Sequence, residues 1–168
     1  VEYGNSGLRY DAIPSNAPLE PVGPYASSKA ASFVAIHGLA VERNIKLSYL
    51  RIFSAYGKGQ YKDNLWPSLY EAAISGNNYS MTMGEQIRDF ISVESVADEF
   101  VNSLLFDKVK LGVPMVKNIG TGKSLTIREF SEYWWNKLEA KGELQVGAIP
   151  YRKNEVMCFI PEIGNATG

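Results

Sequence analysis

The stretch Pro24-Tyr25-Ala26-Ser27-Ser28-Lys29 decides how the rest of this sequence is interpreted. Pro24 suits the first turn of a helix, where its missing N–H would have no helical partner. Tyr25 and Lys29 are four residues apart, so on a helix they share one face, about one turn from each other. A fixed ammonium favours the phenolate form of a neighbouring phenol, which lets such a pair take and return a proton. The spacing alone leaves a second interpretation open, in which Tyr25 is a half-buried side chain beside a solvated lysine.

Around this stretch the sequence alternates between the periodicities of helices and of buried strands. Small and apolar residues recur at three- and four-residue steps after Pro24, which predicts a helix to about Arg43. The apolar run at 47–53 predicts the buried strand that follows. Ser92 and Thr126 are predicted helix caps, the second within a capping box with Glu129. The remaining predictions are helices at 65–75, 93–106 and 126–141, an extended piece at 79–83, strands at 114–119 and 144–149, and an irregular tail. The predicted fold class is α/β.

The amino-acid composition of the chain excludes several classes of function. The chain has 168 residues, of which 45% are hydrophobic, so it has the material for a buried core and suits one domain or part of a larger one. With 17 Lys+Arg against 18 Asp+Glu, it has no general attraction for nucleic acid or anionic lipid. A single cysteine, Cys158, and a single histidine, His37, allow neither an internal disulfide nor a Cys/His zinc cluster. We therefore expect no metal, a reducing compartment and a cytoplasmic location, with neither nucleic acid nor membrane as a partner.

Four further stretches accompany the Tyr25 stretch in order and at sensible spacing. They are Glu2-Tyr3-Gly4, Pro18-Leu19-Glu20-Pro21, Leu50-Arg51-Ile52-Phe53-Ser54-Ala55-Tyr56-Gly57 and Gly84-Glu85-Gln86-Ile87-Arg88-Asp89-Phe90. Together they resemble the extended short-chain dehydrogenase/reductase family, in particular its nucleotide-sugar epimerases, dehydratases and 4-ketoreductases. The resemblance covers nearly the whole chain and implies the C-terminal portion of a Rossmann-like fold with a smaller α/β substrate-binding region. It assigns residues 1–56 to the end of the dinucleotide-binding region and residues 57–168 mainly to substrate binding, with some segments returning to the main sheet.

The resemblance also implies roles for the residues around the cofactor. The residue matching Tyr25 is the family's catalytic acid/base, and the residue matching Lys29 assists it and binds the nicotinamide ribose of NAD or NADP. Phe53 belongs to a stretch that passes beside the nicotinamide and the sugar. Ser54 stands where asparagine is commoner, and its shorter side chain weakens the expected contact with the sugar.

A second group of residues matches the family's contacts with a nucleoside-diphosphate sugar. Asn64 and Leu65 match a pair that meets the nucleotide diphosphate, and Arg88 matches an arginine that binds its phosphates. Arg152 and Glu155 resemble a C-terminal pair for phosphate and ribose, with glutamate in place of the usual aspartate. Guanidinium forks and a carboxylate suit a diphosphate and a ribose diol. The alternatives are a surface ion pair of Arg88 with Asp89 or Glu85, and a solvated charge run at 152–155.

Two parts of the family pattern are missing from the sequence. It contains no G-x-x-G-x-x-G turn for the cofactor pyrophosphate, and the position of the catalytic serine or threonine falls upstream of Val1. We therefore expect this chain to be the C-terminal part of a larger enzyme and to be inactive alone. Val1 also stands where 4,6-dehydratases carry an acid, and Glu2 would point to the other side of a strand, which makes dehydration the less favoured reaction.

The sequence therefore predicts an NAD(P)-dependent epimerase or 4-ketoreductase acting on a nucleoside-diphosphate sugar. By analogy with related enzymes, a homodimer would form through the Tyr25 helix. The alternative from another class is a non-catalytic nucleotide-binding or scaffold module. A triphosphate-binding loop at Gly120-Thr121-Gly122-Lys123-Ser124 is disfavoured, because Lys117 stands where the G-x-x-x-x-G-K-[ST] pattern needs its first glycine. The ordinary interpretation is a strand-to-helix turn.

Overall fold

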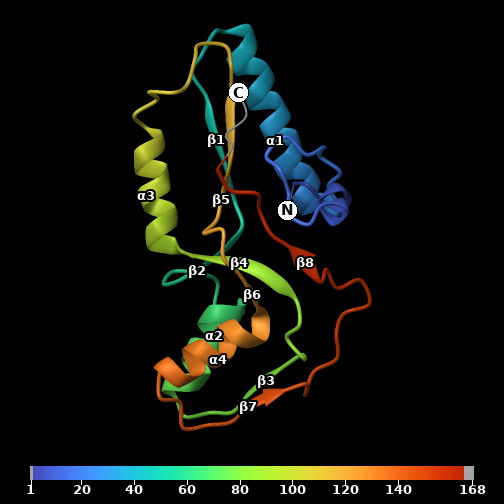
Figure 1. The fold of residues 1–168 in the computed structure, drawn as a ribbon, viewed down its shortest axis with the longest axis vertical. Coiled ribbons are helices and arrows are strands. Elements are labelled where there is room, and N and C mark those ends of the chain that lie inside the picture. The colour runs from blue at the N-terminus through green and yellow to red at the C-terminus, as the bar shows by residue number, and fades with distance from the viewer. Residues whose placement is uncertain (1, 165–168) are drawn as a thin grey trace.

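The computed structural model describes residues 2–164. Val1, and with it the position at which dehydratases carry their acid, lies outside the described residues. The molecule is an elongated α/β structure, with three groups of elements arranged along its long axis (Figure 1). No helix within the described part of the chain is long and apolar enough to cross a membrane.

The first group is built around two parallel strands. Strand β1 (Ser48–Ile52) pairs with β5 (Met115–Ile119), with Leu50 opposite Lys117. Helix α1 (Gly23–Glu42) lies on one side of this pair and α3 (Val93–Ser103) on the other (Figure 1). Helix α1 confirms the helix predicted from Pro24 and carries Tyr25 and Lys29 in its first two turns.

The second group is a small mixed sheet in the middle of the molecule. Its order is β2 (Ser54–Tyr56), β4 (Ile87–Ser92) and β6 (Ser124–Thr126), and β8 (Cys158–Phe159) also pairs with β4. Strand β4 runs parallel to β2 and β8 and antiparallel to β6. Its first three residues pair with β6, and its last three with β2, so β4 connects elements from distant parts of the chain.

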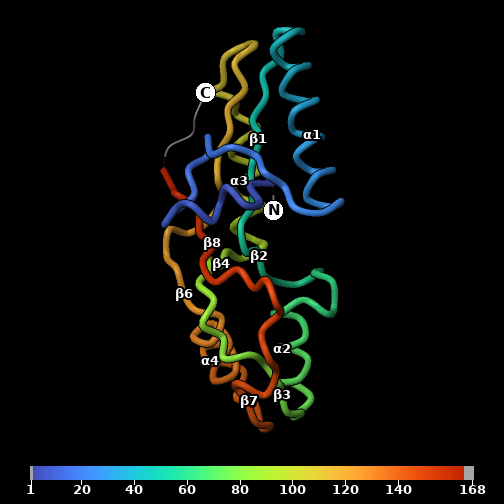
Figure 2. Tube along the Cα trace, turned by 90° about the vertical axis from the view of Figure 1, so that its right-hand side faces the viewer, coloured from blue at the N-terminus to red at the C-terminus, as the bar shows by residue number. Residues whose placement is uncertain are grey.

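The third group packs two helices over a second parallel pair. Helices α2 (Leu65–Ile74) and α4 (Ile127–Lys137) contact each other, and β3 (Tyr79–Met81) pairs with β7 (Leu144–Val146). Leu69, Ala73 and Trp135 are the buried residues of this core. The segment 147–157 then runs from β7 back along the molecule to β8 (Figure 2).

The N-terminal segment packs against the first group and carries a short 3-10 helix, η1 (Asn5–Arg9). Tyr3 and Ile13 are fully buried, and the Tyr3 hydroxyl donates to Asn118 Oδ1 at 2.6 Å. Gly4 follows with φ 52°, and a Cβ there would lie 1.9 Å from the Glu20 carbonyl oxygen. Only glycine fits this close approach.

Both predicted helix caps are present. Ser92 Oγ accepts from the Ser95 amide at 3.1 Å, and Thr126 and Glu129 form the full capping box. The helix ends predicted near Arg43 and at 75 agree with the structure to within one residue, but those at 106 and 141 are wrong. The backbone is left-handed at Phe106 (φ 51°) and Glu139 (φ 49°), which is incompatible with a helix that continues through them. Four strands were not expected: none was predicted at β2 or β4, β6 follows the predicted strand-to-helix turn, and β8 lies in the predicted irregular tail.

Candidate functional site

Two neighbouring cavities, which share two residues, bring most of the predicted site residues together. The first, of about 550 Å³, is lined by Tyr25, Lys29 and Phe53 among others. The second, of about 250 Å³, is lined by Asn64 and Leu65 among others. Ser54 and Arg88 line both cavities. Seven predicted residues therefore follow one continuous path from the Tyr25 helix to the start of α2.

Tyr25 and Lys29 lie together at one end of this path. Lys29 Nζ is 5.6 Å from the centre of the Tyr25 ring, as expected for a pair one helical turn apart. Tyr25 is 66% exposed, so its hydroxyl is open to a ligand. Among residues 2–164, no carboxylate forms an ion pair with Lys29. The ammonium is therefore available both to its neighbouring phenol and to a ligand hydroxyl.

The first cavity suits one end of a nicotinamide cofactor. Beside the Tyr25–Lys29 pair, its wall includes the apolar side chains of Leu50, Ile52 and Phe53. An apolar wall suits the face of a nicotinamide ring, and an ammonium suits the diol of the adjoining ribose. The residues present thus fit the nicotinamide-ribose end of NAD.

Arg88 is held at the junction of the two cavities. Its Nη2 donates to the Val156 carbonyl at 2.6 Å, and its Nη1 donates to the Ile87 carbonyl at 2.8 Å. Burial lowers the pKa of Arg88, and the nearby charge of Glu155 acts in the opposite direction. These acceptors are neutral carbonyls, so the guanidinium keeps its positive charge toward the cavities.

The predicted alternative for Arg88, a surface ion pair with a neighbouring acid, is not what the structure has. Glu85 Oε2 accepts from the Tyr151 hydroxyl at 3.1 Å. The Asp89 carboxylate is bonded to Thr121 and Gly122 instead. Neither acid pairs with Arg88 among the described residues.

Sequence reasoning missed an acid in the wall of the first cavity. Glu2 was expected on the far side of a strand, but it lies in a turn and lines the cavity. Its carboxylate accepts from the Tyr49 hydroxyl at 2.6 Å and from Arg51 Nε at 2.9 Å. Arg51 is 7% exposed and lies over the rings of Phe33 and Tyr3, 4.4 and 4.8 Å from their centres. These contacts join residues 47 and 49 positions apart, so no local pattern reveals them.

The second cavity combines a free amide with an aromatic wall. Asn64 is the N-terminal cap residue of α2, but its side chain makes no capping bond and lines the cavity. Phe90 stacks on Phe130 with ring centres 3.9 Å apart, and Tyr56 meets Phe130 edge-on at 5.0 Å. Burial raises the pKa of Tyr56 above its ordinary value. A flat ring and a polar group would both find partners here.

Two predicted residues lie apart from this path. Arg152 is exposed and lines neither cavity. Glu155 is half-buried, and its amide donates to the Arg152 carbonyl at 3.2 Å, which closes a turn. The negative charge of Glu155 is therefore close enough to act on Arg88. The Arg152 guanidinium, in contrast, does not line either cavity.

Comparison with known proteins identifies the family. Residues 2–120 match the model of the NAD dependent epimerase/dehydratase family, and the chain belongs to this family. The resemblance and the α/β fold class predicted from the sequence are thereby confirmed, and the family's NAD dependence agrees with the predicted cofactor.

Individual relatives are distant. CDP-abequose synthase of Salmonella typhimurium is 26% identical over 80% of this chain and 46% of its own length. UDP-arabinose 4-epimerase 1 of Arabidopsis thaliana is 25% identical over 85% of this chain and 38% of its own. The chain thus spans under half the length of these curated relatives.

Solved structures share the fold. A UDP-N-acetylglucosamine 4-epimerase from Methanobrevibacter ruminantium, in complex with UDP-N-acetylmuramic acid, superposes with a TM-score of 0.79 at 23% identity. The match covers 94% of this chain and 52% of that one. DesIV, a dTDP-glucose 4,6-dehydratase from Streptomyces venezuelae with NAD bound, gives a TM-score of 0.74 at 22% identity, over 90% of this chain and 46% of its own.

Proposed function

We propose that this chain forms the acid/base and substrate side of an NAD(P)-dependent epimerase or 4-ketoreductase that acts on a nucleoside-diphosphate sugar. One observation carries the proposal: Arg88 lines both cavities. It shares the first cavity with the Tyr25–Lys29 pair and the second with Asn64 and Leu65. A sugar placed between them would meet the phenol at one end and the guanidinium at the other.

Each residue then has a definite task. Tyr25 exchanges a proton with a sugar hydroxyl or carbonyl, and the Lys29 ammonium lies one helical turn from it in the same cavity. When bound, NAD(P) would accept a hydride from the sugar carbon or, in its reduced form, donate one to it. Arg88 binds the diphosphate by charge-assisted hydrogen bonds, and Ser54 lies between the two ends. Contacts of Arg152 and Glu155 with the phosphate and the ribose remain a prediction. The boundary near residue 56 between the cofactor and substrate regions also remains a prediction.

Dehydration is the less favoured reaction, although an acid does lie in the cavity wall. Elimination of water needs a carboxyl group that is free to donate a proton. Both oxygens of Glu2 are already occupied, one by Tyr49 and the other by Arg51. With both oxygens engaged, the Glu2 carboxyl is not placed to protonate a leaving hydroxyl.

The test is Tyr25→Phe in the intact enzyme, assayed for turnover of nucleoside-diphosphate sugars. The substitution keeps the ring and removes the proton, so we expect the rate to fall by about 10²- to 10⁴-fold with little change in substrate affinity. Tyr61→Phe is the matched control, because Tyr61 is equally exposed at 67% and lines neither cavity. Activity of Tyr25→Phe within about threefold of the unmodified enzyme would remove Tyr25 from the mechanism and favour a non-catalytic nucleotide-binding module.

A further inference from the structure

The glycine turn that resembles a phosphate-binding loop holds an anion from the protein itself. The Asp89 carboxylate accepts from the Thr121 amide at 2.8 Å through Oδ1 and from the Gly122 amide at 2.7 Å through Oδ2. The Thr121 hydroxyl adds a third donor, at 2.6 Å from Oδ1. Successive amides that converge in this way form an anion-binding concavity.

These hydrogen bonds give the buried Asp89 carboxylate the partners that no cationic side chain of the described residues provides. Asp89 is 1% exposed, and no cationic side chain among residues 2–164 forms an ion pair with it. Burying a carboxylate without partners is costly, and the three donors of the turn satisfy the oxygens of Asp89. Gly120 leaves the room needed, because a Cβ there would lie 2.7 Å from Asp89 Oδ2.

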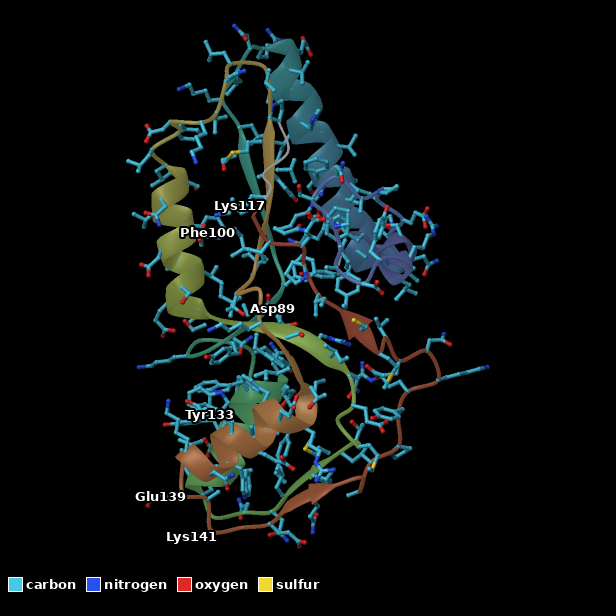
Figure 3. All side chains as sticks on the ribbon, in the orientation of Figure 1. Asp89, Phe100, Lys117, Tyr133, Glu139 and Lys141 are labelled. Atoms are coloured by element: carbon cyan, nitrogen blue, oxygen red, sulfur yellow. The ribbon has the colours of Figure 1, made fainter. Side chains whose placement is uncertain are left out.

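The position of Asp89 on β4 connects this turn to the candidate site. Adjacent residues of a strand point to opposite faces, so Asp89 meets the turn while its neighbour Arg88 meets the cavities. Asp89 is also the last β4 residue that pairs with β6, opposite Ser124, before β4 turns to β2 at Phe90. Figure 3 shows Asp89 at this junction, where the central sheet meets the end of β5.

We propose that Asp89 is a positioning residue for Arg88. By fixing β4 to the turn at 120–122, it holds the guanidinium at the junction of the two cavities, where the diphosphate would bind. The inference rests on the proposed function, because it assigns phosphate binding to Arg88. It also explains why a glycine turn followed by Lys123 and Ser124 need not bind a nucleotide phosphate: its amides are already used.

A double-mutant cycle with Asp89→Asn and Arg88→Ala tests this proposal. The readouts are the Kd for a nucleoside diphosphate by calorimetry and, in the intact enzyme, KM and kcat. Asp89→Asn keeps the size of the side chain but turns an NH2 group toward amide donors. We expect Kd and KM to rise about tenfold, the equivalent of about 1.4 kcal/mol, with kcat changed less than about twofold. In the Arg88→Ala background, Asp89→Asn should add nothing further.

Two further variants separate positioning from a general loss of stability. Thr121→Val removes the hydroxyl donor and should also raise the Kd for the nucleoside diphosphate. Thr121→Ser keeps that donor, so its Kd should equal that of the unmodified protein. These variants also serve if Asp89→Asn does not fold. Asp98→Asn, at an exposed carboxylate of α3, makes the same change in charge away from the site and is the control.

The outcomes distinguish the two proposals. If Arg88→Ala leaves Kd unchanged, phosphate binding by Arg88 is wrong and the proposed function loses its substrate. If Arg88→Ala weakens binding but Asp89→Asn and Thr121→Val do not, only the positioning role is overturned. Additive effects of Asp89→Asn and Arg88→Ala would likewise overturn it, because independent sites add.

Discussion

Arg51 is a buried cation beside the first cavity, and its surroundings explain how the chain accommodates it. Glu2 neutralises the charge, and the Ser15 carbonyl accepts from Nη1 at 2.8 Å. Tyr49 completes the cluster by donating its hydroxyl to Glu2. Removing one partner of such a buried pair is costly, since the other charge is left without compensation. The cluster therefore holds the cavity wall in place and depends on Tyr49 remaining protonated.

This dependence predicts a loss of stability in alkali. Burial, followed by the hydrogen bond to Glu2, raises the pKa of Tyr49 above its ordinary value. A raised pKa means that the folded state favours the neutral phenol. The contribution to stability is complete below about pH 10, the ordinary tyrosine value, and is lost as pH rises through the folded pKa. We expect the thermal midpoint to fall above about pH 10, and to fall less steeply in Tyr49→Phe.

Tyr61→Phe is the control for this measurement, because Tyr61 is 67% exposed and should have little influence on the alkaline slope. Thermal unfolding followed by circular dichroism at several pH values gives the comparison. An alkaline slope that is identical in Tyr49→Phe and in the unmodified chain would contradict the prediction.

Among the elements, α1 carries both buried and exposed apolar side chains. Ala26, Ala30 and Ala40 are buried against the rest of the molecule. Val34, one turn after Ala30, is 62% exposed, and Val41, seven residues further on, is 50% exposed. Exposed apolar side chains at this spacing suit packing against another helix.

The exposed valines of α1 offer a test of the expected homodimer. We predict that Val34→Lys shifts the intact protein from dimer to monomer, because the exposed apolar surface of this helix would gain a charge in the interface. Val101→Lys on α3 is the matched control, since Val101 is 64% exposed and undergoes the same substitution. Light scattering after size-exclusion chromatography measures the mass. A Val34→Lys protein that keeps the dimer mass, or an unmodified protein that is a monomer, would exclude pairing through α1.

The elements also show how far the sequence determines the structure. Helix α1 and the caps at Ser92 and Thr126 follow from local periodicity and local hydrogen bonds, so they were predictable. Strands β6 and β8 were not, because each consists of three residues or fewer and depends on pairing with β4. The site divides in the same way. Tyr25 and Lys29 are a local signal, whereas the role of Asp89 depends on a turn more than 30 residues away.

At the scale of the whole molecule, the chain presents only part of a cofactor site. Tyr25, Lys29 and Phe53 fit the nicotinamide-ribose end, but no G-x-x-G-x-x-G turn for the pyrophosphate occurs anywhere in the 168 residues. Most of the charge of a dinucleotide lies in its phosphates, which the helix N-terminus after such a turn normally binds. Contacts with one ring and one ribose must then account for all of the binding.

We therefore predict that the 168-residue chain alone binds NADH with a Kd of about 1 mM or weaker, which corresponds to about −4 kcal/mol. Lys29→Ala should weaken even this residual binding, because the ammonium is the charged donor toward the ribose. Nicotinamide fluorescence during a titration with the chain is the measurement, and Lys123→Ala is the control, since Lys123 lines neither cavity. A low micromolar Kd would contradict the prediction and would require a pyrophosphate site within these residues. A Kd near 1 mM that is unaffected by Lys29→Ala would instead show that the residual binding lies outside the Tyr25 cavity.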